Sequence, residues 1–389
     1  MRASRTILTA VVALAILPTV LSQETGKQAG AIRPAPPKGK GLVVLRAARL
    51  IDGTGKAPIS NAVVIVTDEK ITAVGAAVDV RVPAGARIID LGDATLLPGF
   101  VDAHTHLIGR VLGDPEIETS AVRDYESFGA ILGVGNARDT LAAGFTTVRN
   151  VGASGRFDDL ALRKAINDLI KTCATGGVLS EGDAVGTTQY NYDELKVMVD
   201  EATKLERKVA AHAHGTEGIK IATRAGVASI EHGSFIDEEG ARLMAQRGTF
   251  LVPTMMAGEA VERAAGSGIL KGQRAEKALA AAAALRNGIK IAVANKVPIA
   301  LGTDAGVIAH GTNAREFVLM VEWGGMSPME SIVAGTLNGS KLLGWDKNLG
   351  SLTVGKWADI VAVSGDPLKD IHNMQKTVFV MKNGLIYKQ

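Results

Sequence analysis

Two pairs of histidines in this sequence are spaced so that both rings of each pair can reach one metal ion. The apolar run LLPGFVDAHTH ends in His104 and His106, and the run AAHAHG contains His212 and His214. Side chains two residues apart on a β-strand point to the same face of the sheet. With His232 in SIEHG, these motifs hold five of the seven histidines in the chain. The spacing therefore predicts a metal site.

Two other side chains follow apolar runs of the same kind. Lys171 lies in LIKTCATGG and Asp304 lies in ALGTDAG. A lysine at one strand end, considered alone, is more typical of an ordinary ion pair. Because Lys171 occurs within a regular order of such motifs, we interpret it and Asp304 as parts of the same site.

The segments that must position these residues alternate between short apolar runs and helical stretches. This alternation favours an α/β fold with a (β/α)8-type TIM barrel at residues 98–345, whose active site lies at the carboxyl ends of the strands. Ser327 followed by Pro328 predicts a helix that begins there and runs to about Leu343. Seven candidate strands are present rather than eight: 99–103, 146–150, 169–173, 209–213, 227–230, 249–253 and 298–302.

Both flanks of the barrel contain short β-type runs separated by Gly, Asp and Pro. The first flank spans residues 42–97 and the second spans residues 346–389. Because the two flanks have similar runs, we expect their strands to pair in one small β-sandwich built from both chain ends. The candidate strands are 42–45, 62–66, 71–74 and 87–91 in the first flank, and 358–363, 378–381 and 385–387 in the second.

The amino terminus has the pattern of a secretory signal at residues 1–22. Arg2 and Arg5 precede an apolar stretch, and small residues near Ser22 form a cleavage site. A polar, Pro-rich linker is expected at residues 23–41. The pattern predicts an exported, periplasmic or secreted protein without membrane attachment after signal removal; a membrane anchor is the alternative. The lone Cys173 cannot form a disulfide within the chain.

The composition favours a small-molecule or dipeptide substrate. The chain has 389 residues, of which 43 are Lys or Arg and 40 are Asp or Glu, for a net charge of +3. Few aromatic residues lie among the scattered basic ones, so the sequence has no nucleic-acid footprint.

The ordered motifs resemble those of the amidohydrolase superfamily. The likeness extends from about Leu42 to the carboxyl terminus and includes PGFVDAHTHL, GFTTVRNVG, LIKTCATGGVLSEGD, HAHGTEGIKIATRAGVASIEHG, LGTDAG and GSLTVGKWADIV. It is closest to the prolidase-like and Xaa-Arg/Lys dipeptidase branch, which includes ochratoxin-hydrolysing amidases.

This resemblance implies a binuclear centre with two divalent metal ions, expected to be zinc, although manganese or cobalt suits the same ligands. His104, His106 and Asp304 would hold one metal, and His212 and His232 the other. Lys171 would bridge both as a carbamate formed with CO2. A hydroxide shared by the metals would attack an amide carbonyl.

The resemblance also implies roles in proton transfer and substrate binding. Asp304 would move the proton during hydrolysis, and His214 is a second catalytic candidate. Tyr190, Tyr192 and Arg149 are candidates for holding a substrate carboxylate. The expected reaction is hydrolysis of dipeptides or N-acyl amino acids, including ochratoxin-type amides, with release of the carboxyl-terminal amino acid.

Two alternatives remain open from the sequence. The first is a mononuclear deaminase or imidazolonepropionase-like hydrolase of cyclic amides. Glu217 suits that class, because it lies three residues after His214, as does the acid of mononuclear deaminases; a helix-capping role suits it equally well. The second is an inactive metal-binding deletion variant.

The chain departs from the family between Asn150 and Leu169. Only the eighteen residues 151–168 lie there, enough for a loop and one helix such as 158–167, where relatives have a third barrel strand and two helices. The third strand is therefore predicted to be missing. We expect the exposed edge to lower stability or to be covered in a homo-oligomer.

Overall fold

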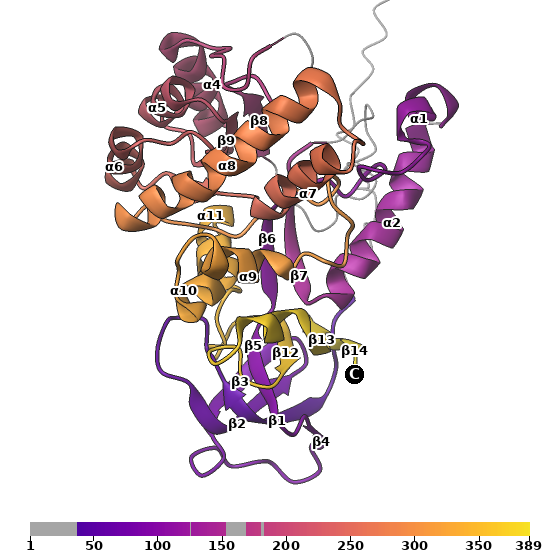
Figure 1. Ribbon diagram of the computed structural model, residues 1–389. Coiled ribbons are helices and arrows are strands. Elements are labelled where there is room, and N and C mark those ends of the chain that lie inside the picture. Colours follow the sequence, from indigo (N-terminus) through magenta and orange to yellow (C-terminus); the bar gives the residue numbers. More distant parts are fainter. Residues whose placement is uncertain (1–36, 125, 153–168, 180–182) are drawn as a thin grey trace, which may run out of the picture. The chain divides into compact units, whose positions relative to one another are not determined.

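The structure is a computed structural model that describes residues 37–124, 126–152, 169–179 and 183–389. The predicted signal sequence, most of the predicted linker and the predicted helix at 158–167 lie outside these residues. Within the described part, a sheet made from both chain ends is followed by a barrel-like set of strands and its helices (Figure 1).

Eight strands from the two chain ends form a single sheet. Their order is β14-β13-β12-β5-β1-β2-β3, and β4 pairs with β1. The two ends of the chain meet where β5 pairs antiparallel with β12, with Leu97 opposite Val361. The hydrogen bonds join all eight strands in one sheet, and sandwich packing stays a prediction. The strands are β1 (Leu42–Leu50), β2 (Ile59–Thr67), β3 (Lys70–Ala76), β4 (Arg87–Asp90), β5 (Ala94–Pro98), β12 (Ile360–Ser364), β13 (Thr377–Lys382) and β14 (Leu385–Lys388).

Burial on both faces explains why the inner strands of this sheet read as continuous apolar runs. In β2, Val64 packs in a large cluster with Leu45, while Val63 packs with Val44 on the opposite face. Partly buried side chains from residues 77–86 complete the second cluster. The sheet therefore has an apolar layer on each side of its central strands.

The second set of strands is parallel throughout. It comprises β6 (Phe100–Thr105), β7 (Phe145–Asn150), β8 (Leu169–Cys173), β9 (Lys208–Ala213), β10 (Ser229–His232) and β11 (Phe250–Val252). One sheet joins β6 to β7, and another has the order β11-β10-β9-β8. The predicted strand at 298–302 forms only isolated bridges, but its segment connects these two sheets. Ala300 N donates to Leu251 O on one side, and Ala103 N donates to Leu301 O on the other.

The described strands form no ladder between β7 and β8, which come before and after residues 153–168. This is the position of the third strand that the sequence predicts to be missing. Its loss stays a prediction, because residues 153–168 are outside the described part of the chain.

Helices flank the parallel strands. Ser327 caps α10 through a reciprocal pair of bonds with Glu330, and helical structure continues through η2 and α11 to Leu343, which confirms the prediction for this segment. None of the described helices is both long and apolar enough to cross a bilayer. The helices are α1 (Ile117–Arg123), α2 (Glu126–Ala142), α4 (Tyr192–Lys204), α5 (Thr216–Ala225), α6 (Glu238–Arg247), α7 (Met255–Gly266), α8 (Gly272–Ala294), α9 (Arg315–Glu322), α10 (Pro328–Val333), η2 (Ala334–Asn338), α11 (Gly339–Leu343) and η3 (Ile371–Gln375).

Aromatic packing fixes helix α9 against the first two parallel strands. The Phe100 ring lies edge-on to Phe145 and to Phe317, with centroids 5.4 and 5.0 Å apart. All three side chains are buried. Because such rings bury a large area and pack in specific orientations, they hold the first turn of α9 against the first residues of β6 and β7.

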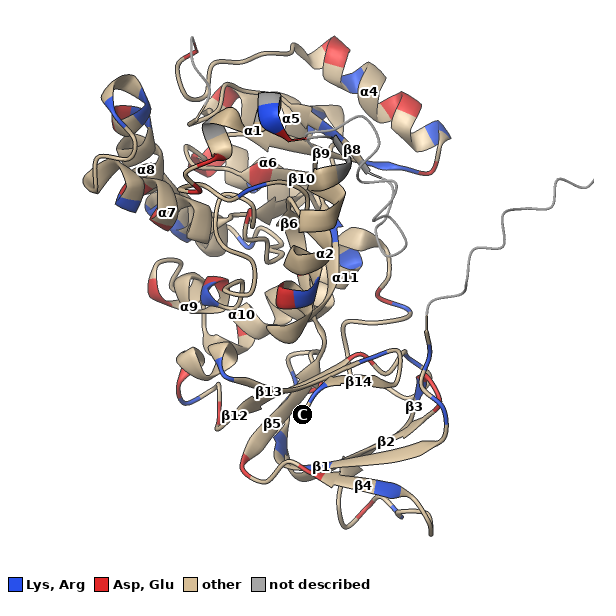
Figure 2. Cartoon of the chain, turned by 90° about the vertical axis from the view of Figure 1, so that its right-hand side faces the viewer, with Lys and Arg blue, Asp and Glu red and all other residues tan. Residues whose placement is uncertain are grey.

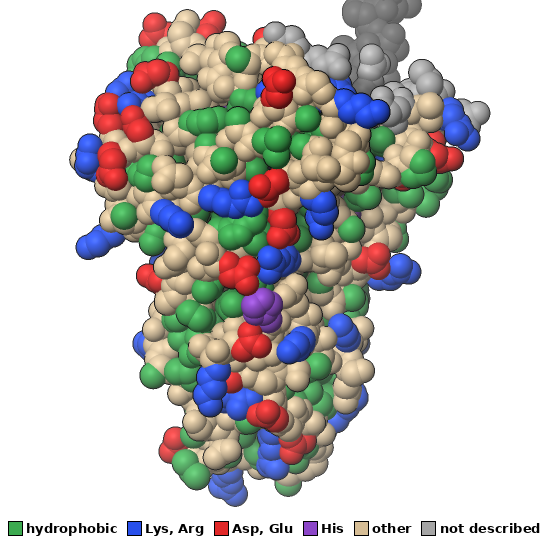
Figure 3. Space-filling model, viewed as in Figure 1, with side chains coloured by type: hydrophobic (Ala, Val, Ile, Leu, Met, Phe, Trp, Pro, Cys, Tyr) green, Lys and Arg blue, Asp and Glu red, His purple; other side chains and the backbone are tan. Residues whose placement is uncertain are grey.

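The charged side chains are of mixed sign. Lys and Arg are interspersed with Asp and Glu over the described part of the chain (Figure 2). On the face seen in Figure 3, side chains of opposite charge lie next to one another rather than in a stripe of one sign.

Candidate metal centre

The predicted ligands converge on one cavity at the carboxyl ends of the parallel strands. The cavity has a volume of about 480 Å³. All six predicted metal ligands line it, together with the second catalytic candidate His214; the six are His104, His106, Lys171, His212, His232 and Asp304. Residues that are up to 200 positions apart in the sequence thus line the same cavity.

Close approach of the backbone brings two of these segments together. A Cβ atom at Gly302 would lie 2.8 Å from the His104 Cβ and 2.3 Å from a Val252 methyl group. Only glycine fits between the two neighbouring strands at this point. The absent side chain lets Asp304 approach the histidines of β6.

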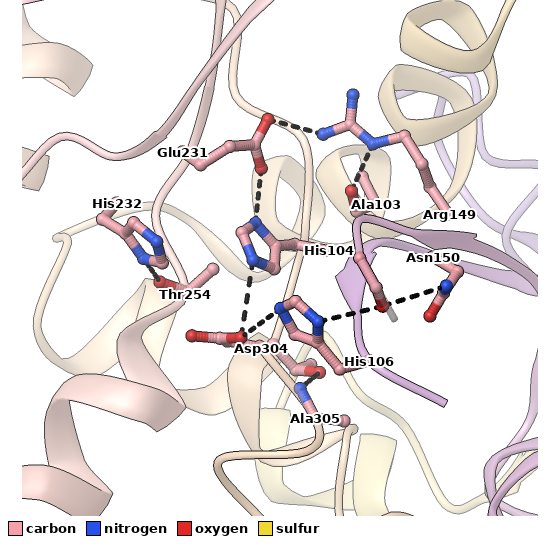
Figure 4. Close-up of polar contacts among 12 residues, drawn as sticks. Ala103, His104, His106, Arg149, Asn150, Glu231, His232, Thr254, Asp304 and Ala305 are labelled. Carbon is pink, nitrogen blue, oxygen red and sulfur yellow. Dashed lines mark hydrogen bonds and ion pairs between the residues drawn. The ribbon is translucent and has the colours of Figure 1, made fainter. Parts of the chain in front are cut away.

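Asp304 lies at the centre of the first group of possible ligands (Figure 4). Its Oδ1 atom is 3.4 Å from His104 Nε2 and 3.3 Å from His106 Nε2. His104, His232 and Asp304 each place one donor atom within 4.8 Å of the others. This set offers two imidazoles and a carboxylate, which are typical ligands of Zn²⁺.

A second group consists of three imidazoles. His212, His214 and His232 also place one nitrogen each within 4.8 Å of one another, and the His212 and His232 ring centroids are 4.6 Å apart. His232 belongs to both groups. His214, which the sequence predicts only as a catalytic candidate, therefore also lies where it could bind a metal ion.

Hydrogen bonds orient four of the histidine rings through Nδ1. Glu231 Oε2 is 2.6 Å from His104 Nδ1, and Thr254 Oγ1 is 2.7 Å from His232 Nδ1. Gly152 O and Ser234 Oγ are the corresponding partners of His106 and His214, at 3.3 and 2.8 Å. An ionised carboxylate or a carbonyl can only accept, so His104 and His106 carry their proton on Nδ1 and keep the Nε2 lone pair free.

Burial favours the neutral form of three of the imidazoles, those of His212, His214 and His232. Desolvation lowers the pKa of His212 and of His232 well below the ordinary value, with neighbouring histidines adding to the effect. Burial also lowers the pKa of His214 to about 4. Neutral imidazole is the form that binds metals.

The carboxylate at the centre is ionised. Burial alone would raise the pKa of Asp304, but its contacts with His104 and His106 outweigh burial and hold the pKa well below its usual value. Burial also lowers the pKa of Lys171, which increases the fraction of free amine at that position.

Arg149 serves a different purpose from the one predicted. Its guanidinium donates to Glu231 Oε1 at 2.7 Å and also to Ala103 O and Ser229 Oγ. Arg149 is 2% exposed and is not among the residues that line the cavity. The correction has a physical cause: Glu231, which is fully buried, needs a buried cation, so Arg149 supports His104 through Glu231 instead of holding substrate.

The two tyrosines predicted to bind substrate also lie away from the cavity lining. Tyr190 is partly buried against the main core, and Tyr192 is 43% exposed at the start of α4. Gln189, their neighbour, lines the cavity instead. Glu217 is exposed and pairs with Lys220 at 3.7 Å.

Sequence reasoning missed Asp102 as a residue that organises the site. Its buried carboxylate accepts bonds from His104 N at 3.1 Å, Thr303 N at 3.1 Å, Thr303 Oγ1 at 2.6 Å and Asn313 Nδ2 at 2.8 Å. These bonds tie β6 to the segment that carries Asp304. Its position two residues before His104 was the available signal, because that spacing places both on one face.

Three cavity residues have a backbone conformation that is unusual for non-glycine residues. His232, Thr254 and Asp304 have φ values of 72°, 51° and 59°. Such conformations cost about 1–3 kcal/mol each and persist where surrounding contacts fix them. Their concentration at one cavity is typical of a functional site.

Helices α7 and α8 contribute an apolar wall to the cavity. The wall consists mainly of small and aliphatic side chains on α7 and α8: Ala257, Gly258, Val261, Ala281, Ala282 and Leu285. Such a wall can bury an apolar part of a ligand while the polar side holds its reactive group.

Comparisons with known proteins agree on one family. Residues 95–170 and 158–386 match the model of the amidohydrolase family. Ochratoxinase of Aspergillus niger is 38% identical over 224 residues, which are 57% of this chain and 46% of the relative. The matched part thus spans about half the length of that curated relative.

Two solved structures share the fold over most of the chain. A Xaa-Pro dipeptidase with methionine bound in its active site is 31% identical, with a TM-score of 0.83, and the match covers 90% of this chain and 100% of that one. The crystal structure of A. niger ochratoxinase is 27% identical, with a TM-score of 0.76 and coverage of 90% and 96%.

Proposed function

The chain belongs to the amidohydrolase family, and on that premise we propose that it is a metal-dependent hydrolase that cleaves the amide bond of dipeptides or N-acyl amino acids. The family match confirms the resemblance identified in the sequence. The observation that carries the proposal is the convergence of five histidines, Lys171 and Asp304 on one cavity.

The residues present fit a pair of divalent ions. A set of imidazole donors with an ionised aspartate suits Zn²⁺. His104, His106 and Asp304 would hold one ion, and His212 and His232 the other, with Lys171 between them as a carbamate. The lowered pKa of the Lys171 amine supports this last assignment, because only a free amine combines with CO2. When bound, the ions lower the pKa of a water molecule and polarise the scissile carbonyl.

Asp304 and His214 are the groups placed to move protons. Asp304 is ionised, lines the cavity and lies beside His104 and His106 (Figure 4), so it can accept a proton from water and return it to the leaving amine. His214 is neutral and buried beside Ser234, and is a second group of suitable type. The hydrogen bonds of Glu231 and Asp102 hold His104 and Asp304 in position while this occurs.

The apolar wall supports a substrate with an apolar group next to the amide. Xaa-Pro dipeptides and ochratoxin-type amides, which the names of the relatives indicate for those proteins, are members of this class. Ala281 and Ala282 leave room along α8 where larger residues would fill it. We propose that an apolar side chain of the substrate lies against this wall and that hydrolysis releases the carboxyl-terminal amino acid.

A deaminase with one metal ion is the weaker candidate. It would use Glu217 as its acid, but the Glu217 side chain is 69% exposed and paired with Lys220, and it does not line the cavity.

Three features of the proposal concern the whole protein. We propose that the chain is exported to the periplasm or secreted, that it forms a homo-oligomer, and that its barrel lacks the third strand. The family match is in two parts that overlap at residues 158–170, which supports a change in that region. If the loss of the third strand abolishes catalysis, the chain is instead an inactive protein that still binds metal.

The test is an assay of the full chain after reconstitution with Zn²⁺, Mn²⁺ or Co²⁺. The panel should include N-acyl amino acids, dipeptides and cyclic amides, with bound metal measured in parallel. Release of an amino acid from acyclic amides at about two metals per chain supports the proposal. Bound metal without turnover of any substrate contradicts it, and turnover of cyclic amides alone favours the alternative.

A further inference from the structure

The amino terminus of α7 is capped in an unusual way. Thr254 is the residue before the helix, where a threonine hydroxyl would ordinarily accept a hydrogen bond from the second or third helical N–H. The Thr254 side chain makes no such bond. Its hydroxyl donates to Pro253 O at 2.7 Å and lies 2.7 Å from His232 Nδ1.

Glu316 supplies the missing cap from α9, a helix 60 residues later in the chain. Glu316 Oε1 accepts from Met255 N and Oε2 accepts from Met256 N, both at 2.8 Å. The Glu316 side chain is completely buried. Neighbouring Arg315 pairs with Glu259 and Glu322 at 3.1 and 3.3 Å. The two carboxyl oxygens thus accept from the first two N–H groups of α7, although burial raises the pKa of Glu316 to about 8.

This division of bonds determines how His232 is held. Since the single hydroxyl proton of Thr254 goes to Pro253 O, the oxygen can only accept from His232 Nδ1–H. His232 then keeps its lone pair on Nε2. If the helix N–H groups lacked Glu316, the Thr254 hydroxyl oxygen would be the nearest side-chain acceptor in sequence, and its bond to His232 would compete with capping.

We propose that Glu316 is a positioning residue for His232: by capping α7 it leaves the Thr254 hydroxyl free to fix the ring and tautomer of His232. The inference rests on the proposed role of His232 as a metal ligand. The left-handed backbone of both His232 and Thr254 makes this fixation necessary, because neither conformation is favoured without its contacts.

The test compares Glu316→Gln with Glu259→Gln, a matched control that removes a carboxylate from α7 itself. The amide introduced by Glu316→Gln would have one acceptor oxygen for two N–H groups, so one of them becomes available to Thr254. In the metal-free full chain, imidazole ¹⁵N shifts should show a single Nδ1–H tautomer at His232 for wild type and control, and a mixture for Glu316→Gln. Zn²⁺ affinity, measured by competition with a chromophoric chelator, should fall about tenfold, equivalent to about 1.4 kcal/mol.

The threonine variants complete the design. Thr254→Val should give the same tautomer mixture and the same loss of Zn²⁺ affinity as Glu316→Gln. Thr254→Ser keeps the hydroxyl and should retain the wild-type tautomer and affinity. The double variant Glu316→Gln with Thr254→Val should bind Zn²⁺ as tightly as Thr254→Val alone. If Glu316→Gln does not fold, Glu316→Asp, which keeps the carboxyl group but shortens its reach, should show the same changes to a smaller extent.

A single tautomer and unchanged Zn²⁺ affinity in the folded Glu316 variant would overturn the inference, as would a lowered melting temperature with no change in either readout. Because the tautomer is measured without metal or substrate, these outcomes are distinct from failure of the proposed hydrolase function.

Discussion

Replacement of Arg149 by methionine should destabilise the fold by about 3–5 kcal/mol at pH 7, the usual cost of removing one partner of a buried ion pair. The Arg149 and Glu231 side chains are 3% and 0% exposed and 2.7 Å apart. Methionine preserves much of the apolar volume but leaves the carboxylate with only His104 and Ser229 as polar contacts. The loss therefore comes from an uncompensated buried charge.

The pKa of Glu231 gives the expected pH dependence. Burial acts to raise this pKa, but Arg149, followed by His104, outweighs burial and lowers it from 4.5 to about 2. This difference corresponds to about 3 kcal/mol, in agreement with the mutational range. A carboxylate with a depressed folded-state pKa adds stability above its unfolded pKa and loses it as the pH falls through the folded value.

In Arg149→Met, desolvation of Glu231 is no longer offset by the guanidinium, so we expect the pKa of Glu231 to rise above 4.5 and the stability of the variant to depend on pH in the opposite sense. Its Glu231 would be neutral at low pH and an unpaired anion at high pH, so the variant loses stability as the pH rises through that pKa. The difference in unfolding free energy between wild type and Arg149→Met should thus be largest at neutral pH and should shrink as the pH falls toward 2.

Urea unfolding of the metal-free chain, followed by circular dichroism from pH 2 to 8, measures this difference. The double variant Arg149→Met with Glu231→Gln should be more stable than Arg149→Met at pH 7, since the amide oxygen still accepts from His104 without a charge. Arg138→Met, at a residue whose side chain is 79% exposed, is the control and should change stability by less than about 0.5 kcal/mol. A cost below about 1 kcal/mol for Arg149→Met, or no recovery in the double variant, would refute the reasoning.

Three further predictions concern the proposed reaction. Lys171→Ala should reduce bound metal to about one ion or less per chain and abolish hydrolysis; elemental analysis showing two ions with normal turnover would contradict the bridging role. Asp304→Asn should lower kcat about a hundredfold or more, in line with general acid–base effects. Near-normal turnover in steady-state kinetics would show that another group transfers the proton. Ala282→Leu should raise KM for substrates with bulky apolar side chains far more than for alanyl substrates, because it fills the apolar wall; an equal change for both would show that the wall does not contact substrate.

The sequence was sufficient to predict residues whose role depends on local spacing. His104 and His106 were recognisable because a strand places alternate side chains on one face, and the helix beginning at Ser327 was recognisable because its cap and its Pro328 are adjacent in the chain. The structure brings all six predicted ligands to one cavity.

The residues that support the ligands could not be predicted in the same way. Glu231 contacts Arg149 across 82 positions of the sequence, and Glu316 caps a helix 60 positions before it. Nothing in the spacing of these residues identifies their partners, because tertiary packing alone brings them together. The same reason led the sequence to favour Arg149 as a substrate ligand: a lone arginine at a strand end does not reveal that a buried carboxylate will neutralise it.

The left-handed residues around the cavity place a limit on how this protein could be improved by selection for heat resistance. At about 1–3 kcal/mol each, His232, Thr254 and Asp304 together cost an appreciable part of the net stability of about 5–15 kcal/mol that is typical of a folded domain. Glycine or asparagine at Thr254 would relieve part of this cost. Either substitution would also remove the hydroxyl that holds His232. Laboratory evolution that selects for melting temperature alone would therefore enrich variants that are more stable but bind metal less well.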